Sequence, residues 1–438
     1  MAEDIKVVPK GWRRVRLGEI AKVVSGFGFP TKYQGRDSGD YPFIKVEDLN
    51  RASKYIISAD NYIDKATVDL LKAKIFPPRT IIFPKIGMAL YHNKYRILKV
   101  FGTFDNNIAG IILTKGSSEF LYYYFLWTVD LKRIAGETAV PSVKKSSLEL
   151  IPIIFPPLLE QYKIAEILGT VDGAIEKTDA IIAKYKRIKQ GLMQDLLTRG
   201  IVESDELGVM SYELRDEKKH RFKDSPLGRI PEEWEIKKDF IKIFSGYGFA
   251  LKEYSEDGIF LIRIDNIGHG RLIHENFAYL PEKYKHLYER FLIKRGDILL
   301  ALNRPITREK LKIAKVDLDN AILYQRVGKL LFRNEIEKNF YFYYMQSNFF
   351  IKQLEISLVG SDQPYITDTD FKDLLFKFPP LLEQHRIASI LSQIDEAIEK
   401  EKKYKEKLER IKRGLMEDLL TGKVRVLGVM NYELGVKS

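Results

Sequence analysis

The feature that most constrains the fold of this chain is a long stretch that occurs twice, as residues 156–198 and 379–421. Each copy begins with Pro-Pro-Leu-Leu-Glu-Gln and ends on Gly-Leu-Met-x-Asp-Leu-Leu-Thr. Between these ends, apolar residues recur mainly at steps of three and four, the spacing of a helix packed along another long helix. Such a helix is about 60 Å long at about 1.5 Å per residue. It cannot enclose a core alone, so we expect the two copies to pack on each other.

The expected seam of each helix consists of apolar residues on one face. In the first copy they are Ile164, Leu168, Val171, Ile175, Ile182, Tyr185, Leu192 and Leu196, and in the second Ile387, Leu391, Ile394, Ile398, Leu408, Leu415 and Leu419. Gly191 and Gly414 occupy equivalent points inside these helices, where glycine costs about 1 kcal/mol relative to alanine. Their placement indicates close approach of another backbone, with a simple bend as the alternative.

The rest of the chain is duplicated too. Ser-Gly-Phe-Gly-Phe at residues 25–29 returns as Ser-Gly-Tyr-Gly-Phe at 245–249, and the aromatic run at 120–125 returns at 340–344. The first segment alternates β-rich runs with turn residues and contains one helical stretch, which is typical of an α/β domain. The expected strands lie at residues 15–24, 43–46, 80–83, 97–101 and 108–113, and the expected helix at 119–135.

The repeat divides the chain into parts. They are an α/β domain at 1–155, a spacer helix at 156–198, a charged connector at 199–227, a second α/β domain at 228–378, a second spacer helix at 379–421, and a tail at 422–438 that packs back toward the first domain. We therefore expect an α/β (α+β) fold with two similar domains at opposite ends of an antiparallel helix pair, related by a pseudo-twofold axis.

The composition narrows the class of protein. A net charge of +12 indicates a polyanionic partner such as nucleic acid, although charge alone is weak evidence. The absence of cysteine excludes disulfides, thiolate nucleophiles and sulfur-ligated metal sites. The chain contains no apolar run near the ~20 residues that span a bilayer, and its start lacks a signal-peptide pattern. We expect a cytoplasmic protein.

Motifs for catalysis are not found. The pairs Gly26-Phe27-Gly28 and Gly246-Tyr247-Gly248 lack the full G-x-G-x-x-G, so a turn beside the core is favoured over a cofactor loop. The chain has neither a P-loop nor the Asn/Asp-Pro-Pro-Tyr/Phe signature of an amino-methyltransferase. Six histidines without paired metal spacing predict no metal site.

Basic and amide side chains gather in the expected loops between strands. Each one alone is best explained as solvated surface, but the set in a basic, duplicated protein favours DNA, because these side chains read base edges and hold phosphates. The candidates are Lys32, Tyr33, Gln34, Arg36, Lys45, Lys85, Asn106 and Asn107 in the first domain, and Lys252, Arg263, Asn266, His269, Arg271, Arg304, Arg308, Gln325 and Arg326 in the second.

The duplicated helix ends, with the entry Lys223-Asp224-Ser225-Pro226-Leu227-Gly228-x-Ile230-Pro231-Glu232-x-Trp234, resemble a specificity (S) subunit of a type I restriction–modification system over the full length. The resemblance implies two target-recognition domains that each read one part of a split duplex DNA site, joined by spacer helices. It also implies docking of two methyltransferase subunits, which modify adenine at N6 with S-adenosylmethionine, and of a translocating endonuclease subunit. Catalysis, ATP and Mg would then belong to these partners and not to this chain.

Matched helix ends suggest matched docking points for two copies of one partner. The candidates are Glu160, Gln161, Gly191, Glu383, Gln384 and Gly414. Three other functions stay open at this point: a helical scaffold that spaces two protein-binding modules, an RNA-binding protein, and, least favoured, a methyltransferase in its own right.

Overall fold

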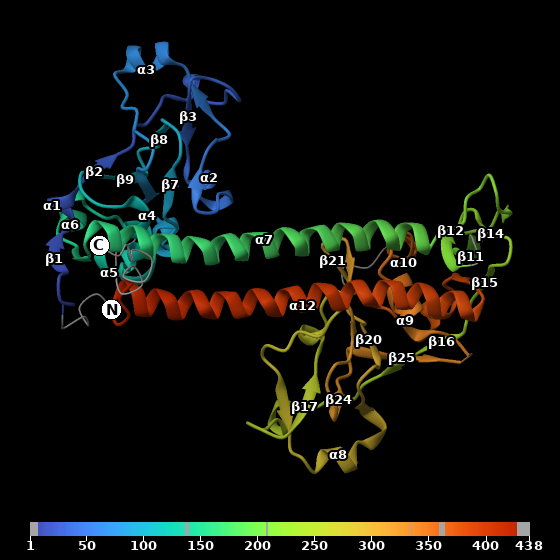
Figure 1. Cartoon of the computed structure of the whole chain (residues 1–438). Coiled ribbons are helices and arrows are strands. Elements are labelled where there is room, and N and C mark those ends of the chain that lie inside the picture. Colours follow the sequence, from blue (N-terminus) through green and yellow to red (C-terminus); the bar gives the residue numbers. More distant parts are fainter. Residues whose placement is uncertain (1–7, 136–139, 207–208, 334, 359–363, 427–438) are drawn as a thin grey trace, which may run out of the picture. The chain divides into compact units, whose positions relative to one another are not determined.

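The computed structural model describes residues 8–135, 140–206, 209–333, 335–358 and 364–426. The chain forms two compact units, which we call unit 1 (Met1–Ala180 with Lys403–Ser438) and unit 2 (Ile181–Lys402). Their boundary crosses the helices α7 (Leu158–Leu196) and α12 (Leu381–Leu420), coloured green and red in Figure 1. Each unit therefore contains the first half of one long helix and the second half of the other.

The two long helices begin and end where the sequence predicts, to within two residues. Each begins directly after a Pro-Pro pair, because a residue followed by proline is disfavoured in the helical conformation. Each is followed by a left-handed glycine, Gly200 with φ +64° and Gly422 with φ +71°, a conformation that glycine adopts at little cost and that stops a helix.

The long helices pack antiparallel within each unit. In unit 1 the ammonium of Lys405 contacts Asp179 at 2.7 Å and that of Lys412 contacts Asp172 at 2.6 Å, so positions rise along α12 as they fall along α7. In unit 2 the end of α7 shares a core with the start of α12. The predicted seam residues that are buried are Ile164, Leu168, Ile182, Leu196, Ile387, Leu391, Ile398, Leu408 and Leu419.

Unit 1 contains a five-stranded sheet of order β2-β9-β6-β7-β4, a three-stranded sheet of order β5-β3-β8, and the pair β1-β10. Its strands are β1 (Arg13–Arg16), β2 (Ala21–Ser25), β3 (Tyr41–Ile44), β4 (Tyr55–Ile56), β5 (Tyr62–Ile63), β6 (Ile81–Pro84), β7 (Arg96–Leu98), β8 (Thr103–Phe104), β9 (Ile108–Leu113) and β10 (Pro152–Phe155). Its short helices are α1 (Leu17–Ile20), η2 (Thr31–Tyr33), α2 (Val46–Arg51), α3 (Lys65–Leu71), η3 (Met88–His92), α4 (Ser118–Thr128), α5 (Leu131–Ala135) and α6 (Lys145–Glu149).

Unit 2 contains two four-stranded sheets, of orders β16-β25-β20-β23 and β18-β17-β24-β19, and several strand pairs. Its strands are β11 (Ile201–Glu206), β12 (Val209–Leu214), β13 (Phe222–Lys223), β14 (Ile230–Pro231), β15 (Glu235–Lys237), β16 (Ile241–Ser245), β17 (Ile259–Ile262), β18 (Ala278–Leu280), β19 (Leu292–Ile293), β20 (Ile298–Ala301), β21 (Ile306–Thr307), β22 (Lys310–Leu311), β23 (Ile313–Lys315), β24 (Ala321–Leu323), β25 (Val327–Phe332) and β26 (Phe376–Phe378). Its short helices are η4 (Leu251–Glu253), η5 (Ile264–Asn266), α8 (Tyr284–Leu287), η6 (Glu289–Phe291), α9 (Lys338–Tyr344), α10 (Asn348–Ser357) and α11 (Asp368–Lys372).

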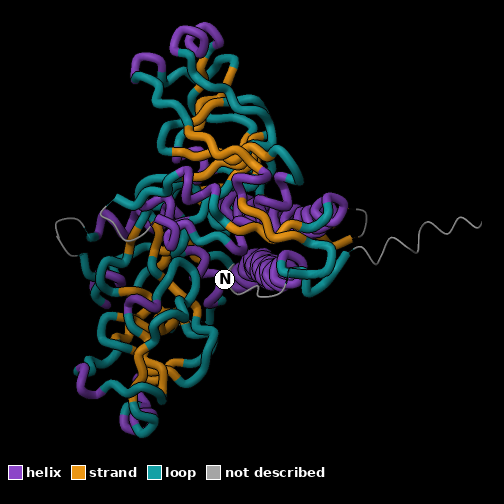
Figure 2. Tube along the Cα trace, turned by 90° about the vertical axis from the view of Figure 1, so that its left-hand side faces the viewer, coloured by secondary structure: helices purple, strands orange, loops and turns teal. Residues whose placement is uncertain are grey.

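The two units repeat one topology. The order β2-β9-β6-β7 in unit 1 corresponds to β16-β25-β20-β23 in unit 2, β5-β3-β8 to β18-β17-β24, and β1-β10 to β15-β26. In Figure 2 the strands of each unit gather in its interior, with many of the short helices toward its periphery. The predicted α/β class and the internal duplication are confirmed.

The aromatic helices α4 and α9 form the centre of each core. Eight of the eleven residues of α4 are buried, as are all five aromatic residues of α9, which agrees with the rule that a helix apolar on all sides lies inside. The core of unit 1 continues from α4 to Ile164 and Leu168 of α7 and to Leu419 of α12. The halves of the long helices therefore belong to the domain core of their own unit.

The structure corrects three sequence-based boundaries. The strand expected at 15–24 is interrupted by the one-turn helix α1, and the helix expected at 119–135 is broken between α4 and α5. The connector at 199–227 contains the paired strands β11 and β12. Among the described residues, no helix combines the length and apolar character needed to cross a membrane.

Candidate nucleic-acid interface and helix junctions

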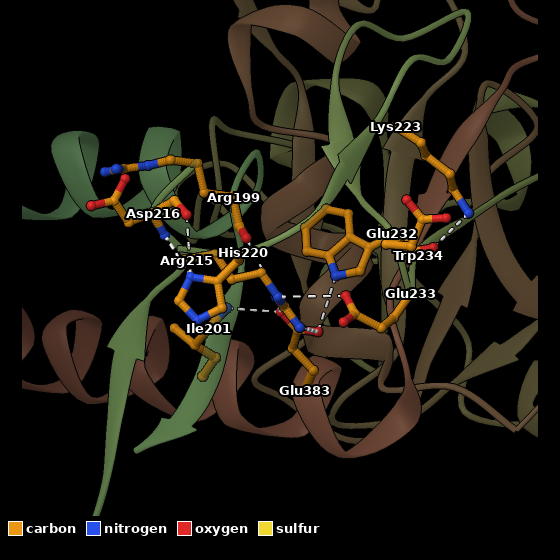
Figure 3. A network of polar contacts seen from close by, with 10 residues as sticks. All are labelled: Arg199, Ile201, Arg215, Asp216, His220, Lys223, Glu232, Glu233, Trp234 and Glu383. Atoms are coloured by element: carbon orange, nitrogen blue, oxygen red, sulfur yellow. Dashed lines mark hydrogen bonds and ion pairs between the residues drawn. The ribbon is translucent and has the colours of Figure 1, made fainter. Parts of the chain in front are cut away.

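A buried ion pair joins the start of α12 to the segment after α7 in unit 2 (Figure 3). The guanidinium of Arg215 contacts both carboxylate oxygens of Glu383, and the indole N–H of Trp234 donates to the same carboxylate at 3.0 Å. The backbone N–H of Ile201 adds a bond at 2.8 Å. The side chains of Arg215 and Glu383 are only 6% and 7% exposed. Because buried charges require a full set of partners, this cluster fixes the junction of the two helices.

Unit 1 builds the same cluster from other parts of the chain. Glu160 accepts a hydrogen bond from the indole of Trp12 at 2.9 Å and two from Arg425, at 2.7 and 2.9 Å. Burial alone would raise the pKa of the Glu160 carboxyl, but the bonds from Arg425 and Trp12 hold that pKa below its ordinary value. Arg425 also donates to the carbonyl of Lys10 at 2.7 Å. The predicted packing of the tail on unit 1 is therefore seen over residues 422–426, whereas residues 427–438 lie outside the described residues.

The four Glu-Gln residues at the helix starts are not surface docking points. The side chain of Gln161 accepts from the backbone N–H of Ser117 at 2.8 Å, and that of Gln384 from Glu337 at 3.1 Å. Glu160, Gln161 and Gln384 are fully buried, and Glu383 is 7% exposed. Their predicted contact with a partner is corrected: they attach each helix start to its own unit. The Glu-Gln pair recurs because each unit needs the same internal attachment.

Gly191 and Gly414 are the docking candidates that stay on the surface. Both are exposed, and a Cβ added at either position would meet no atom within 4 Å. The predicted close approach is therefore not made by any part of this chain that the structure describes. A docking role for these two glycines stays a prediction.

A second polar cluster recurs deeper along the helices. In unit 1 the hydroxyl of Tyr123 donates to Asp172 at 2.6 Å, and Lys412 pairs with the same carboxylate at 2.6 Å. In unit 2, Tyr343 donates to Asp395 at 2.8 Å and Lys189 pairs with it at 2.7 Å. These contacts tie each aromatic helix to both long helices.

Unit 1 adds a buried lysine to its copy of this cluster. Lys54 donates to the hydroxyl of Tyr123 at 2.9 Å. Burial lowers the pKa of Lys54 to about 8, even though the charge of Asp172 acts against that shift.

Four loops meet at one end of the sheets in unit 1, and we call them cluster 1 (residues 25–29, 44–45, 85–87 and 104–107). Backbone hydrogen bonds hold them together, so their arrangement does not depend on the exposed side chains. These bonds run from Gly26 N–H to Ile108 O at 3.1 Å, Phe27 to Phe104 at 2.8 Å, Asp105 to Ile44 at 2.9 Å and Lys85 to Asn107 at 2.9 Å.

Unit 2 repeats this arrangement bond for bond, and we call it cluster 2 (residues 245–249, 262–263, 302–304 and 323–326). The bonds run from Gly246 N–H to Val327 O at 3.2 Å, Tyr247 to Leu323 at 3.0 Å, Tyr324 to Ile262 at 3.1 Å and Leu302 to Arg326 at 3.0 Å. The scaffold is the same in both units, while most exposed side chains on it differ.

The glycine pairs belong to this scaffold. A Cβ on Gly26 would lie 2.1 Å from the carbonyl oxygen of Phe104, and one on Gly246 would lie 2.1 Å from that of Leu323. Glycine is needed because two backbones approach here, which supports the interpretation as a turn beside the core over a cofactor loop. Among the described residues, no group of three His, Cys, Asp or Glu side chains is placed to hold a metal ion.

Eight of the DNA-binding candidates come together on the two clusters. They are Lys45, Lys85, Asn106 and Asn107 on cluster 1, and Arg263, Arg304, Gln325 and Arg326 on cluster 2. Lys85 is half-buried and donates to Ser25 at 2.8 Å, and burial lowers the pKa of its ammonium. Of these eight, the most exposed are Asn106, Asn107, Arg304, Gln325 and Arg326.

The other candidates lie beside the clusters or serve the fold. Lys32, Tyr33 and Gln34 are in or next to η2, where the Gln34 amide bonds to the carbonyl of Phe29, and Lys252 is in η4. Arg36 is exposed and pairs with Asp64. Asn266 is corrected: it is fully buried and caps η5 by accepting from the Arg263 N–H at 3.0 Å and donating to the Ile273 carbonyl at 3.2 Å. His269, Arg271 and Arg308 are exposed near the hairpin β21-β22.

Sequence reasoning missed part of that hairpin. Thr307, Lys310 and Lys312 belong to it or its base but were not among the candidates. The sequence carried little signal for it, because residues 306–311 have four consecutive polar side chains between two apolar ones and do not alternate as a strand does.

Comparison with known proteins identifies the family. A family model described as the type I restriction modification DNA specificity domain matches residues 9–186 and again residues 231–410. The MjaVIII specificity subunit of a type I restriction enzyme from Methanocaldococcus jannaschii is 34% identical over 429 residues, covering 96% of this chain and 94% of the relative. The putative MjaX specificity subunit from the same organism is 26% identical and covers 97% of this chain and 96% of the relative.

Solved structures share the fold. The S subunit of a type I restriction–modification system from M. genitalium matches with a TM-score of 0.60 at 14% identity, covering 94% of this chain and 97% of that one. A second chain, from a structural study of complex assembly and conformational transition of the type I R-M system, matches with a TM-score of 0.51 at 17% identity, covering 95% of this chain and 100% of that one.

Proposed function

Because this chain belongs to the type I restriction–modification DNA specificity family and is a specificity subunit of such a system, we propose that clusters 1 and 2 read the two halves of a bipartite duplex DNA site. The observation that carries this proposal is the loop scaffold built twice with different exposed side chains. Cluster 1 exposes Asn106 and Asn107 where cluster 2 exposes Gln325 and Arg326. Different donors and acceptors select different bases in the major groove, so the two half-sites should differ.

The proposal assigns no catalysis to this chain. S-adenosylmethionine-dependent methylation of adenine at N6, and cleavage that uses ATP and Mg, would belong to two methyltransferase subunits and the restriction subunits that assemble with it in the cytoplasm. The exposed Gly191 and Gly414 are the docking positions that remain. The long helices would set the gap between half-sites. Removing about seven residues from both, about 10 Å of helix, should shorten the gap by up to about three base pairs at about 3.4 Å each.

Competition binding tests the proposal. The chain purified with its methyltransferase partner should bind one duplex sequence far more tightly than unrelated duplexes, and RNA of the same sequence should not compete. Binding without preference among duplexes, or preference for RNA, would contradict it. Transfer of a radiolabelled methyl group by the isolated chain would contradict the assignment of chemistry to the partner.

A further inference from the structure

A short hairpin extends from cluster 2, and the described segment that corresponds to it in unit 1 has a different form. It consists of β21 and β22, with Thr307 opposite Lys310 and Ile306 opposite Leu311. Unit 1 has the 3₁₀ helix η3 in the corresponding segment after β6. The correspondence is fixed by one repeated contact: the N–H of Gly87 donates to the carbonyl of Pro141 at 2.8 Å, and that of Arg304 to Pro364 at 2.8 Å.

The hairpin is held firmly at its base. Leu311 is 2% exposed and belongs to the main core of unit 2, against which Ile306 also packs. The ammonium of Lys312 donates to the carbonyl of Ile264 at 2.9 Å. His269 lies 3.1 Å from the carbonyl of Leu311 through Nδ1 and 3.3 Å from the hydroxyl of Thr307 through Nε2. These contacts give His269 a bracing role, with both of its ring nitrogens engaged by the hairpin.

Arg304 before the hairpin and Arg308 at its tip have a backbone conformation that favours glycine. Arg304, Arg308 and Glu309 have φ values of +45°, +51° and +58°. Non-glycine residues with positive φ are uncommon, and a two-residue hairpin loop of this kind prefers Asn-Gly. Unit 1 has glycine, Gly87 with φ +76°, where unit 2 has Arg304. Backbone strain of this kind concentrates at functional sites, which indicates a use for the arginine side chains themselves.

The chemistry of the tip matches the edge of a guanine. A two-stranded β-ribbon fits into the major groove of B-DNA, and a planar guanidinium makes two parallel bonds to guanine O6 and N7. Arg308 is exposed between two strands whose apolar side is buried, and Lys310 beside it is exposed as well. Arg304, in cluster 2, precedes β21 by two residues, and the N–H of Lys312 donates to the carbonyl of Pro305 at 2.7 Å at the base of the hairpin.

We propose that the β21-β22 hairpin enters the major groove of the half-site read by unit 2 and that Arg308 selects a guanine there. Lys310 contacts a phosphate, which holds the hairpin without choosing a base. The inference rests on the proposed function and deepens it, because it assigns a residue and a base to one half-site only.

The test is the methylation motif of the assembled complex. Complexes carrying the unaltered chain, Arg308→Ala, Arg308→Lys or the matched control Lys310→Ala are purified from the native host and given a library of randomised duplexes. Both Arg308 variants should lose about 10- to 100-fold of selectivity at one guanine position, with the other half-site unchanged. Lys310→Ala should weaken methylation of every sequence to about the same degree and preserve the motif.

The outcomes separate the inference from the function on which it rests. An unchanged motif with Arg308→Ala would overturn the role of Arg308 and leave the proposed function standing. Loss of the methyltransferase from the Arg308→Ala complex without a change of motif would also overturn the role of Arg308, because the hairpin would then contact a protein subunit. Altered base preference with Lys310→Ala would overturn the division between the two residues. Methylation without any motif by the unaltered complex would overturn both proposals.

Discussion

The two helix junctions make the same contacts with arginines from different places in the sequence. In unit 2 the arginine that pairs with the buried glutamate is Arg215, which follows β12, whereas in unit 1 it is Arg425, which follows α12 by five residues. Glutamate and tryptophan occupy equivalent repeat positions, Glu383 with Trp234 and Glu160 with Trp12. Both units therefore pair the buried carboxylate with an arginine, but that arginine comes from a different position of the sequence repeat in each unit.

The loop clusters show the opposite relation. Their backbone bonds and glycines occur at equivalent positions, but the exposed side chains on them differ between the units. A scaffold fixed by backbone bonds tolerates new side chains at its surface, because the bonds do not involve those side chains. The contacts that stabilise the junctions and the loop scaffold are thus repeated, while the exposed side chains of the surface proposed to read DNA differ.

The largest expected effect breaks the junction of unit 2. Arg215→Ala leaves Glu383 buried without its cation and should destabilise unit 2 by about 3–5 kcal/mol. Arg425→Ala should cost unit 1 less, because the Arg425 side chain is 32% exposed and water can replace part of its contact. Hydrogen exchange, read separately in each unit, measures both losses.

A control for this pair is Arg199→Ala, which removes a half-exposed ion pair to Asp195 near the same junction and should cost at most about 1 kcal/mol. Equal losses for the Arg215 and Arg425 variants would show that the degree of burial does not set the strength of the two junctions.

The next largest effect on stability comes from a buried lysine of unit 2 at a position where unit 1 has an isoleucine. Lys377 in β26 is 3% exposed, and the equivalent residue of β10 is Ile154. Burial lowers the pKa of Lys377 to about 8, below the ordinary value of 10.5. Between these values the unfolded chain binds more protons than the folded one, so this lysine makes stability rise with pH from about 8 to 10.5 and imposes a constant cost below pH 8.

Lys377→Ile should therefore stabilise unit 2 at pH 7, by up to about 3 kcal/mol, and the gain should shrink above pH 8 and vanish near pH 10.5. Denaturation followed at several pH values measures the gain. The converse change, Ile154→Lys, should place the same pH dependence in unit 1. A gain for Lys377→Ile that is independent of pH would mean that packing, and not the buried charge, causes it.

The smallest effect concerns the exposed glycines of the long helices. Gly191→Ala and Gly414→Ala should each stabilise the isolated chain by about 1 kcal/mol, because alanine is the better helix former and no neighbour obstructs its Cβ. If both glycines admit close approach of a partner, the same variants should weaken assembly with the methyltransferase. Stabilisation with unchanged assembly, measured by analytical ultracentrifugation, would remove the two glycines as docking points.

Part of this structure could be predicted from the sequence. The long helices were predicted to within two residues because a repeated Pro-Pro opening and a repeated Gly-Leu-Met-x-Asp-Leu-Leu-Thr ending mark their limits in the sequence. The duplicated topology followed from repeated motifs. The role of Glu383 could not be predicted, because its partner Arg215 lies 168 residues away and a carboxylate in a helix start normally faces water.

The candidate site was predicted less well than the fold. Eight of the candidates chosen by residue type and position lie on the two clusters, where DNA contact stays a prediction, but Asn266 was taken for a DNA contact when it serves as a buried cap. The hairpin tip at Arg308 was recognised as basic, while its strained backbone is visible only in three dimensions. The sequence indicates which side chains are suited to contact DNA. It does not show which of them are instead used for contacts inside the folded domain.

The most direct test of the central claim is to sequence the methylated adenines in the native genome. Two copies of one scaffold with unlike surfaces predict a bipartite motif with two different half-sites separated by a gap of constant length. A palindromic motif, or a single continuous one, would contradict the assignment of one half-site to each unit.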